Sequence, residues 1–195
     1  MQSTVQDYNA FYLKRIDETI KKALLEHHRT LAIRVDLRLP DYPADSDAEV
    51  ISRFTDSLKA KIRAYLERKR QEGKRIHPCT LRYAWAREFG PLNGKKHYHV
   101  LLLLNKDVWF TPGDYQSESS LAGLIKQAWC SALRVSYPGN ATLVHFPENP
   151  CLWLDRNSMD YSKQQEEVMK RASYLCKNIT KQYGDGERSF GCSQY

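Results

Sequence analysis

The segment His97-Tyr98-His99-Val100-Leu101-Leu102-Leu103-Leu104 decides which fold this chain adopts. It is short, and it is apolar throughout after its second histidine, which is typical of a strand buried inside a sheet. Residues i and i+2 of a strand project from the same face, so His97 and His99 are expected to hold two imidazoles side by side. Such a pair is half of a metal site.

The residues before this strand predict the other half. The pair Asn93-Gly94 lies between two strand-like runs and is the strongest short-range signal for a β-hairpin. With these two residues as the turn, Glu88 is placed opposite His99, and opposed residues share a face at about 5 Å between Cβ atoms. Two neutral imidazoles and one carboxylate, with positions left for water or substrate, suit a reactive divalent cation better than a closed structural site. The sequence therefore predicts a metal centre formed by Glu88, His97 and His99.

Two other interpretations of the histidine pair compete with this one. A surface strand can carry two histidines by chance. The cupin barrel also uses a His-x-His pair, but it places a glutamate a few residues after the pair. The apolar run Val100 to Leu104 follows here instead, which disfavours the cupin fold.

The size and charge of the whole chain predict one domain that binds polyanions. Its 195 residues are enough to bury a core without disulfides. Thirty Lys and Arg against 23 acidic residues give a net charge of +7, which favours nucleic acid as a partner. Five cysteines form no C-x-x-C pair, which is typical of reduced thiols. Because no secretory segment or long apolar run occurs, we expect a cytoplasmic protein with no membrane association.

Hydrophobic periodicity predicts an N-terminal helix followed by strand, helix, strand, strand, helix, strand and helix. The expected elements are a helix over 8–28, a strand over 30–39, a helix over 45–72, strands over 80–89 and 97–104, a helix over 119–135, a strand over 141–146, and a helix from 162. This order is that of an α+β fold of the ferredoxin-like or RRM-like kind, a β-α-β-β-α-β antiparallel sheet with two helices on one face. The other face is expected to be open.

Strand alternation predicts which side chains line the open face. They are Arg34, Asp36, Arg38, Arg82, Glu88, His97 and His99. Arginines on such a face are often simply solvated. Beside a metal cluster, we interpret them as phosphate contacts.

The last predicted helix carries a candidate nucleophile. Its apolar stripe is formed by Val168, Ala172, Leu175 and Ile179. Its far flank is formed by Lys163, Lys170, Tyr174, Lys177 and Lys181. Because residues three apart share a helical face, Tyr174 and Lys177 would pair a phenol that can attack a phosphate with an ammonium that stabilises the charge. The alternative is an ordinary surface tyrosine, since 12 tyrosines offer accidental Tyr-x-x-Lys matches.

Together these motifs resemble the HUH endonucleases, which include rolling-circle replication initiators, relaxases and single-strand transposases. In that family a His-hydrophobic-His strand supplies two metal ligands, the preceding strand often supplies a third, and a helix carries the nucleophile as Tyr-x-x-Lys. The matching positions are 97–102, Glu88, and Tyr174 with Lys177. A closer resemblance is to the inovirus gene II type of initiator and its prophage relatives, the YagK/YfjJ C-terminal domain family. It is carried by residues 34–40, 97–105 and 174–177 and spans about residues 28–182.

The resemblance implies the chemistry of a rolling-circle replication initiator. A Mg²⁺ or Mn²⁺ ion would be held by the predicted cluster, and Tyr174 would attack single-stranded or hairpin DNA at a replication origin to leave a 5′-phosphotyrosine and a free 3′-OH. DNA contacts are expected from Arg34, Arg38, Arg82, Lys95, Lys96, Lys170 and Lys181. A host helicase and polymerase would complete replication. The chain would divide into an N-terminal helical cover (1–29), the endonuclease domain (30–184) and a flexible tail (185–195).

Alternative functions stay open on the sequence alone. The fold can be kept by a DNA-binding regulator of a mobile element that has lost cleavage, and the same motifs serve transposases and relaxases. An RRM-like RNA-binding domain is less consistent, because His97 and His99 occupy the strand positions where that fold carries stacking aromatics. Tyr161 and Tyr183 lack the lysine three residues on, so a single nucleophile, Tyr174, is favoured.

Overall fold

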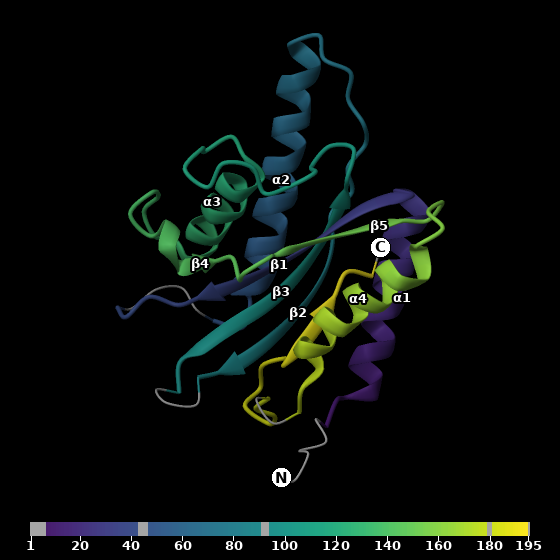
Figure 1. The fold of residues 1–195 in the computed structure, drawn as a ribbon. Coiled ribbons are helices and arrows are strands. Elements are labelled where there is room, and N and C mark those ends of the chain that lie inside the picture. The colour runs from purple at the N-terminus through teal and green to yellow at the C-terminus, as the bar shows by residue number, and fades with distance from the viewer. Residues whose placement is uncertain (1–6, 43–46, 91–93, 179–180, 195) are drawn as a thin grey trace.

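The computed structural model describes residues 7–42, 47–90, 94–178 and 181–194, and an antiparallel sheet of six strands lies at its centre (Figure 1). The strands are β1 (Arg29–Arg38), β2 (Arg82–Phe89), β3 (Lys96–Asn105), β4 (Val144–His145), β5 (Cys151–Asp155) and β6 (Phe190–Cys192). The helices are α1 (Ala10–Glu26), α2 (Val50–Gln71), α3 (Leu121–Leu133) and α4 (Tyr161–Ala172), with 3₁₀ turns η1 (Ala141–Leu143) and η2 (Ser173–Cys176). Among the described residues, no helix combines the length and apolarity needed to cross a membrane.

The order of the strands confirms the predicted ferredoxin-like core. Neighbours across the sheet run β4-β1-β3-β2-β6, with β5 also paired to β1. The unit β1-α2-β2-β3-α3-β4 therefore forms the expected β-α-β-β-α-β arrangement. The helices α2 and α3 begin and end within a few residues of their expected positions, and Gly73 follows α2 with φ of 74°, as a helix-ending glycine does.

One face of the sheet packs against α2 and α3 because every second residue of β1 and β3 is apolar. Leu31, Ile33, Val35 and Leu37 of β1 are fully buried there. Trp129 of α3 is also fully buried, and its indole N–H donates to the carbonyl oxygen of Arg38 at 2.8 Å. This core fixes the faces of β1 and β3, and with them the direction in which the histidines project.

The second face is partly covered by α1 and α4 (Figure 1). Apolar residues of these helices, with Leu175 and Cys176 of η2, pack on a group formed by Ala32, Ala84, Ala86, Leu101 and Leu103. Farther along the same face, toward the ends where β1 and β2 finish and β3 begins, the side chains become polar. Among the described residues, α1, α4 and η2 therefore cover the apolar end of this face, and Glu88 and His99 lie at its polar end.

The β2–β3 hairpin has a different register from the one expected. Glu88 pairs with His97, whereas the predicted turn placed it opposite His99. The backbone N–H of Gly90 donates to the carbonyl oxygen of Lys95 at 2.9 Å, so the connection is longer than a two-residue turn, and Asn93 lies outside the described residues. Because the shift is two residues, Glu88 stays on the face of both histidines.

The strand expected over 141–146 is wrong in its extent. Residues 141–143 form the turn η1, β4 contains only Val144 and His145, and the unpredicted β5 pairs with β1 after a break. Pro147 and Pro150 lie in that break and have no N–H to donate to a strand ladder. The chain rejoins the sheet at once, because the N–H of Arg34 donates to the carbonyl oxygen of Pro150 at 2.9 Å.

The segment expected to be a flexible tail, residues 185–195, contributes a strand to the sheet. β6 adds to the edge of β2, with Ala84 opposite Cys192 and Ala86 opposite Phe190. Gly191 lies against Trp85, and a Cβ at this glycine would meet the indole at 2.6 Å. The close approach of backbone and ring explains why a residue without a side chain stands there.

Candidate functional site

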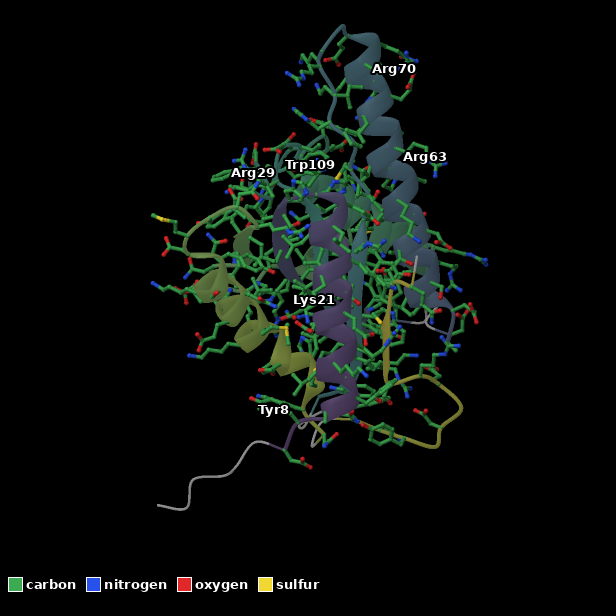
Figure 2. All side chains as sticks on the ribbon, turned by 90° about the vertical axis from the view of Figure 1, so that its right-hand side faces the viewer. Tyr8, Lys21, Arg29, Arg63, Arg70 and Trp109 are labelled. Atoms are coloured by element: carbon green, nitrogen blue, oxygen red, sulfur yellow. The ribbon has the colours of Figure 1, made fainter. Side chains whose placement is uncertain are left out.

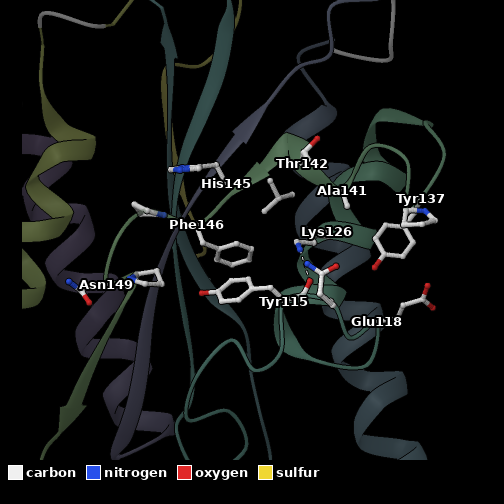
Figure 3. Close-up of a pocket in the computed structure, with 14 residues that line it drawn as sticks. Tyr115, Glu118, Lys126, Tyr137, Ala141, Thr142, His145, Phe146 and Asn149 are labelled. Atoms are coloured by element: carbon white, nitrogen blue, oxygen red, sulfur yellow. Dashed lines mark hydrogen bonds between the residues drawn. The ribbon is translucent and has the colours of Figure 1, made fainter.

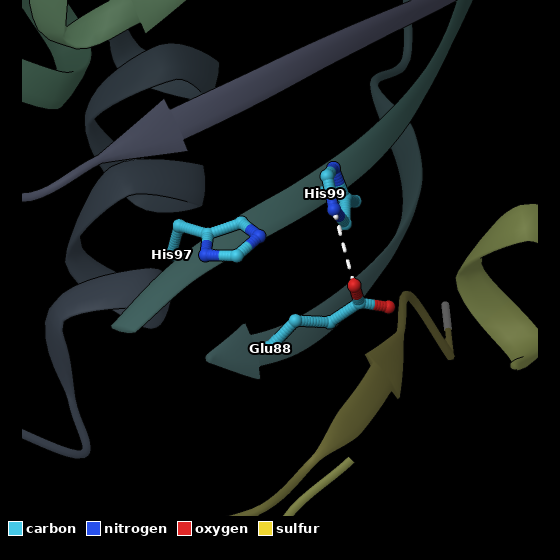
Figure 4. Close-up of side chains that lie close together, drawn as sticks. All are labelled: Glu88, His97 and His99. Carbon is cyan, nitrogen blue, oxygen red and sulfur yellow. Dashed lines mark ion pairs between the residues drawn. The ribbon is translucent and has the colours of Figure 1, made fainter. Parts of the chain in front are cut away.

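Three side chains from β2 and β3 form the candidate metal centre. His97 and His99 project from one face of β3, and Glu88 reaches toward them from β2 (Figure 4). One ligand atom from each residue lies within 4.8 Å of the other two. The carboxylate Oε2 of Glu88 is 3.2 Å from Nε2 of His99, and the two imidazole centroids are 4.9 Å apart. The predicted cluster is therefore assembled by the fold.

The chemistry of these donors fits a divalent metal ion. Atoms that bind one ion at about 2.1 Å lie at most about 4.2 Å apart, so the widest pair needs to close by about half an ångström. Glu88 is 2% exposed, and His99 is 6% exposed. A buried carboxylate facing two imidazoles on rigid strands needs only small side-chain rotations to close on an ion.

Hydrogen bonds behind the imidazoles orient their ring nitrogens. Nδ1 of His99 lies 2.5 Å from Oδ1 of Asp36, and Nδ1 of His97 lies 3.2 Å from the carbonyl oxygen of Lys95. When Nδ1 donates in each case, Nε2 is left as the free donor atom for a metal. A carboxylate behind a ligating histidine is the usual outer partner in metal sites. The sequence alone gave Asp36 no such role.

The pKa values of the cluster follow from burial and from these contacts. Burial alone would raise the pKa of Glu88 and of Asp36, but hydrogen bonds with His99, and with Lys181 for Glu88, lower both pKa values to about 2. Burial alone would lower the pKa of His99, and the two carboxylates outweigh it and raise that pKa. Burial lowers the pKa of His97. Metal binding must displace the Nε2 proton of His99, so metal affinity should rise with pH through the pKa of this residue.

Lys181 is placed differently from its predicted role in DNA binding. Its side chain has no exposed surface, and its ammonium Nζ is 2.5 Å from Oε1 of Glu88. It therefore neutralises one oxygen of Glu88 and leaves Oε2 facing His99. Because the ammonium is enclosed, it cannot contact a DNA backbone at the surface.

Tyr174 lies beside the candidate metal ligands. Its ring centroid is 5.1 Å from that of His99, with the rings edge to face. The Arg34 guanidinium carbon lies 4.3 Å from the centre of the Tyr174 ring, and Lys177 Nζ lies 4.0 Å from it. The Tyr-x-x-Lys spacing thus brings a phenol and an ammonium together beside the cluster.

The local structure around Tyr174 is not the expected α-helix. α4 ends at Ala172, Tyr174 lies in η2, and Lys177 has extended backbone angles. The N-terminal segment holds this turn in place. Tyr8 bridges to Lys177, and the N–H of Asn9 donates to the carbonyl oxygen of Cys176 at 2.8 Å. Ile179, expected in the apolar stripe of the helix, lies outside the described residues.

The other predicted DNA contacts separate into two groups. Arg38, Lys95 and Lys170 are exposed, although Lys95 forms an ion pair with Asp41. Two others are enclosed in ion pairs within the domain: Arg82 with Glu26 of α1, and Lys96 with Glu187 at 3.0 Å. Arg82 and Lys96 therefore stabilise the fold, which their position on a polar strand face did not reveal.

Two hollows flank the site. A cavity of about 500 Å³ beside Tyr174 is lined by Arg34, Leu152, Glu167, Lys170, Arg171 and Tyr174. A cavity of about 950 Å³ lies at the β4 edge, where the rings of Tyr115 and Phe146 meet edge to face at 5.0 Å (Figure 3). His145 lines this second cavity, and its Nδ1 is 3.5 Å from Oδ2 of Asp36. His145 therefore connects the larger cavity to the cluster.

Sequence reasoning missed the roles of Asp36 and His145. Asp36 was placed on the correct face, and its even spacing from Arg34 and Arg38 is a usable signal. Its contact with His99 required the register of β1 with β3, which pairs the two residues directly. His145 gave no signal, because β4 is only two residues long.

Replacing Asp36 by asparagine is expected to weaken metal binding about 10- to 100-fold, because the amide no longer increases the basicity of His99. Calorimetric titration with Mn²⁺ at about pH 8, where protons compete least, measures the change. Asp47→Asn is the matched control, since Asp47 lies near the start of α2 and pairs with Arg53. Equal Mn²⁺ affinity in both variants would show that Asp36 does not act on the ligand.

Comparison with known proteins agrees with the family suggested by the motifs. The model of the YagK/YfjJ C-terminal domain matches residues 2–193. The chain is 40% identical over 192 residues to the uncharacterized protein YagK of Escherichia coli strain K12, covering 94% of this chain and 92% of that protein. It is 36% identical over 197 residues to the uncharacterized protein YfjJ of the same strain, covering 95% and 94%. No solved structure matches the chain. Since the match spans nearly its whole length, the chain belongs to the YagK/YfjJ C-terminal domain family.

Proposed function

We propose that this chain is a metal-dependent endonuclease of the HUH type that nicks and rejoins single-stranded DNA through Tyr174. The observation that carries the proposal is that a phenol lies beside the candidate metal ligands. The ring centre of Tyr174 is 5.1 Å from that of His99. A tyrosine needs an activated phosphate to attack, and a Glu/His/His cluster is suited to hold the ion that activates one.

The bound ion, Mg²⁺ or Mn²⁺, would polarise the scissile phosphate and stabilise the negative charge that develops there. Glu88, His97 and His99 would hold it, and Asp36 would keep His99 oriented. Lys181 would reduce the charge of Glu88 without occupying Oε2. These residues act by binding and positioning, and none of them forms a bond to DNA.

Tyr174 would carry out the covalent step. Its hydroxyl oxygen attacks phosphorus and forms a tyrosine–phosphate ester, while the bond from phosphorus to the 3′ oxygen breaks. The phenol proton passes to water, and the departing 3′ oxygen takes up a proton. Lys177, with Nζ 4.0 Å from the Tyr174 ring centre, lies close enough to stabilise charge on the phosphoryl oxygens. The ester conserves the bond energy, so rejoining needs no nucleotide cofactor.

The two hollows support a path for the DNA strand. Three cations line the smaller hollow beside Tyr174: Arg34, Lys170 and Arg171. Guanidinium groups suit phosphate contacts. The larger cavity offers Tyr115 and Phe146, and aromatic rings stack nucleobases without requiring a particular sequence. A single strand would thus cross the cluster with phosphates on one side and a base in the cavity.

The biological role proposed with this activity is initiation of rolling-circle replication for a phage, prophage or related mobile element, in the cytoplasm of a bacterial host. The free 3′-OH at the nick would prime synthesis. Strand separation and copying would require a host helicase and polymerase as partners.

The proposal is tested by covalent capture of DNA on the wild-type chain. Labelled single-stranded oligonucleotides covering the DNA around the chain's own gene are incubated with Mn²⁺, with and without a chelator. We expect an adduct in denaturing gels that carries the label only when the label lies on the 3′ side of the nick, and that is lost with chelator and in His97→Ala. An adduct that forms equally with chelator, or that retains the 5′-side label, would contradict the mechanism.

A regulator without cleavage activity is the second candidate, and the Lys181–Glu88 contact favours it. This ion pair and the contact of Glu88 with His99 satisfy the cluster electrostatically without a metal. The same assay separates the two functions. Tight binding of an oligonucleotide, with no adduct on any tested sequence, would assign the chain to this class.

A further inference from the structure

Nearly all of the excess positive charge of this chain is concentrated in one short segment. Residues 59–75 contain eight Lys and Arg and two Glu, a net of +6 against +7 for the whole chain. The remaining 178 residues therefore balance to within one charge. The segment consists of the C-terminal half of α2 and the residues that follow it, and we call it the α2 arm.

The α2 arm extends beyond the sheet. Figure 1 shows the C-terminal end of α2 rising past the strands, and the chain returning from it toward β2. Tyr65 packs against Trp109 at the base of the arm, and their ring centroids are 4.4 Å apart. Trp109 is 6% exposed and belongs to the main core, so this contact joins the arm to the core.

The cations of the arm are accessible to a partner. Six of its eight Lys and Arg are exposed, and Figure 2 shows Arg63 and Arg70 along the outer side of α2. Some cations pair with acids of the same helix or the turn after it, as Arg70 does with Glu67. Among the described residues, no acidic group forms an ion pair with Lys61, Arg63, Arg68 or Arg75. These four charges are available for another molecule.

We propose that the α2 arm binds the phosphate backbone of duplex DNA, as a contact separate from the nicking site. Phosphate contacts from Lys and Arg supply sequence-independent affinity for DNA. Proteins that bind single-stranded DNA combine such cations with exposed aromatic rings on which the bases stack. The arm has one aromatic residue, Tyr65, and that ring is packed on Trp109. A charged helix without free aromatics therefore fits a duplex better than a single strand.

The distance between the metal-ligand cluster and the α2 arm sets the length of duplex that can contact both. β3 carries His97 near its start and ends at Asn105, close to the base of the arm, where Trp109 follows. Eight residues of strand span about 26 Å, so the cluster and the base of the arm are separated by about three quarters of a helical turn of B-DNA, which is about 34 Å long. Duplex that flanks a nicked strand would reach the arm only when it is about eight base pairs long or longer, at about 3.4 Å per base pair. This inference does not require nicking, since backbone binding is measured without metal or cleavage.

The test is fluorescence anisotropy of a labelled random-sequence duplex of about 20 base pairs without metal, over about 50–200 mM salt. The arm variant is Arg63→Gln/Arg68→Gln/Arg75→Gln. It leaves every ion-paired residue of the arm unchanged, and glutamine is a good helix former. We expect its affinity to fall at least about tenfold, and the salt slope to fall by about 0.9 for each lost phosphate contact.

The matched control is Lys14→Gln/Lys22→Gln/Lys163→Gln, which removes the same three charges from exposed sites on α1 and α4. It should bind duplex within about threefold of wild type if binding is local to the arm. Equal losses in both variants would overturn the proposal by making the effect one of net charge. An arm variant that keeps its duplex affinity, but loses binding to polyglutamate, would also overturn it and assign the arm to an acidic protein.

Discussion

Tyr174→Phe is expected to abolish the covalent protein–DNA adduct, with a loss of at least about a thousandfold in strand cleavage. The change removes only the hydroxyl group, and the remaining ring can keep its contacts with His99, Arg34 and Lys177. Fold and Mn²⁺ affinity should therefore stay unchanged. Denaturing gels measure the adduct, and calorimetry measures metal binding in the same preparations.

Tyr161→Phe is the matched control for this loss. Tyr161 begins α4, and the 12 residues of that helix separate it from η2 by about 18 Å. It also packs in the apolar cluster under α1 and α4. The adduct should form at the wild-type rate in Tyr161→Phe. An adduct that persists in Tyr174→Phe and disappears in Tyr161→Phe would transfer the nucleophile to the other end of the helix.

Arg87→Met is expected to destabilise the domain by about 2 kcal/mol, less than the loss of a fully buried ion pair, because the Asp185 and Glu187 side chains left without a partner are each 25% exposed. The Arg87 side chain is 2% exposed and donates to both carboxylate oxygens of Asp185 at 2.7 and 2.8 Å. It also donates to the carboxylate and the carbonyl oxygen of Glu187. These contacts hold the segment between Lys181 and β6 on β2. Urea unfolding followed by circular dichroism measures the difference.

The stability difference should also depend on pH in a defined direction. The guanidinium of Arg87 lowers the pKa of Asp185 from 3.8 to about 2. A carboxyl group whose pKa is lowered by folding stabilises the folded state at pH values above its ordinary pKa of 3.8. This contribution is lost as the pH falls toward about 2. The gap between wild type and Arg87→Met should therefore narrow in acid.

Arg29→Met serves as the comparison for Arg87→Met, since Arg29 pairs with Asp107 at 2.6 Å on the surface. Removing an exposed pair should cost less than about 1 kcal/mol. Equal unfolding free energies for the two variants would show that the Arg87 cluster does not stabilise the C-terminal segment.

Local pattern was sufficient for the main elements of the fold. The alternation Leu31, Ile33, Val35, Leu37 predicted both the strand and its buried face, because side chains of a strand alternate between faces. The same reasoning failed for β5 and β6. Their pairing partners are distant in the sequence, and their short runs resemble loops. It also misplaced the register of the β2–β3 hairpin by two residues, since the connection is longer than the Asn-Gly signal suggested.

The sequence by itself determined that His97, His99 and Glu88 share a face, because strand parity survives a two-residue shift in register. It also placed a tyrosine and a lysine three residues apart near the C-terminus. Only the tertiary structure decided that Tyr174 lies against His99, that Asp36 supports that imidazole, and that Lys181 is enclosed beside Glu88. The physical reason is that these contacts join separate elements. The packing of α1, α4 and η2 on the sheet sets their distances, and no local spacing encodes that packing.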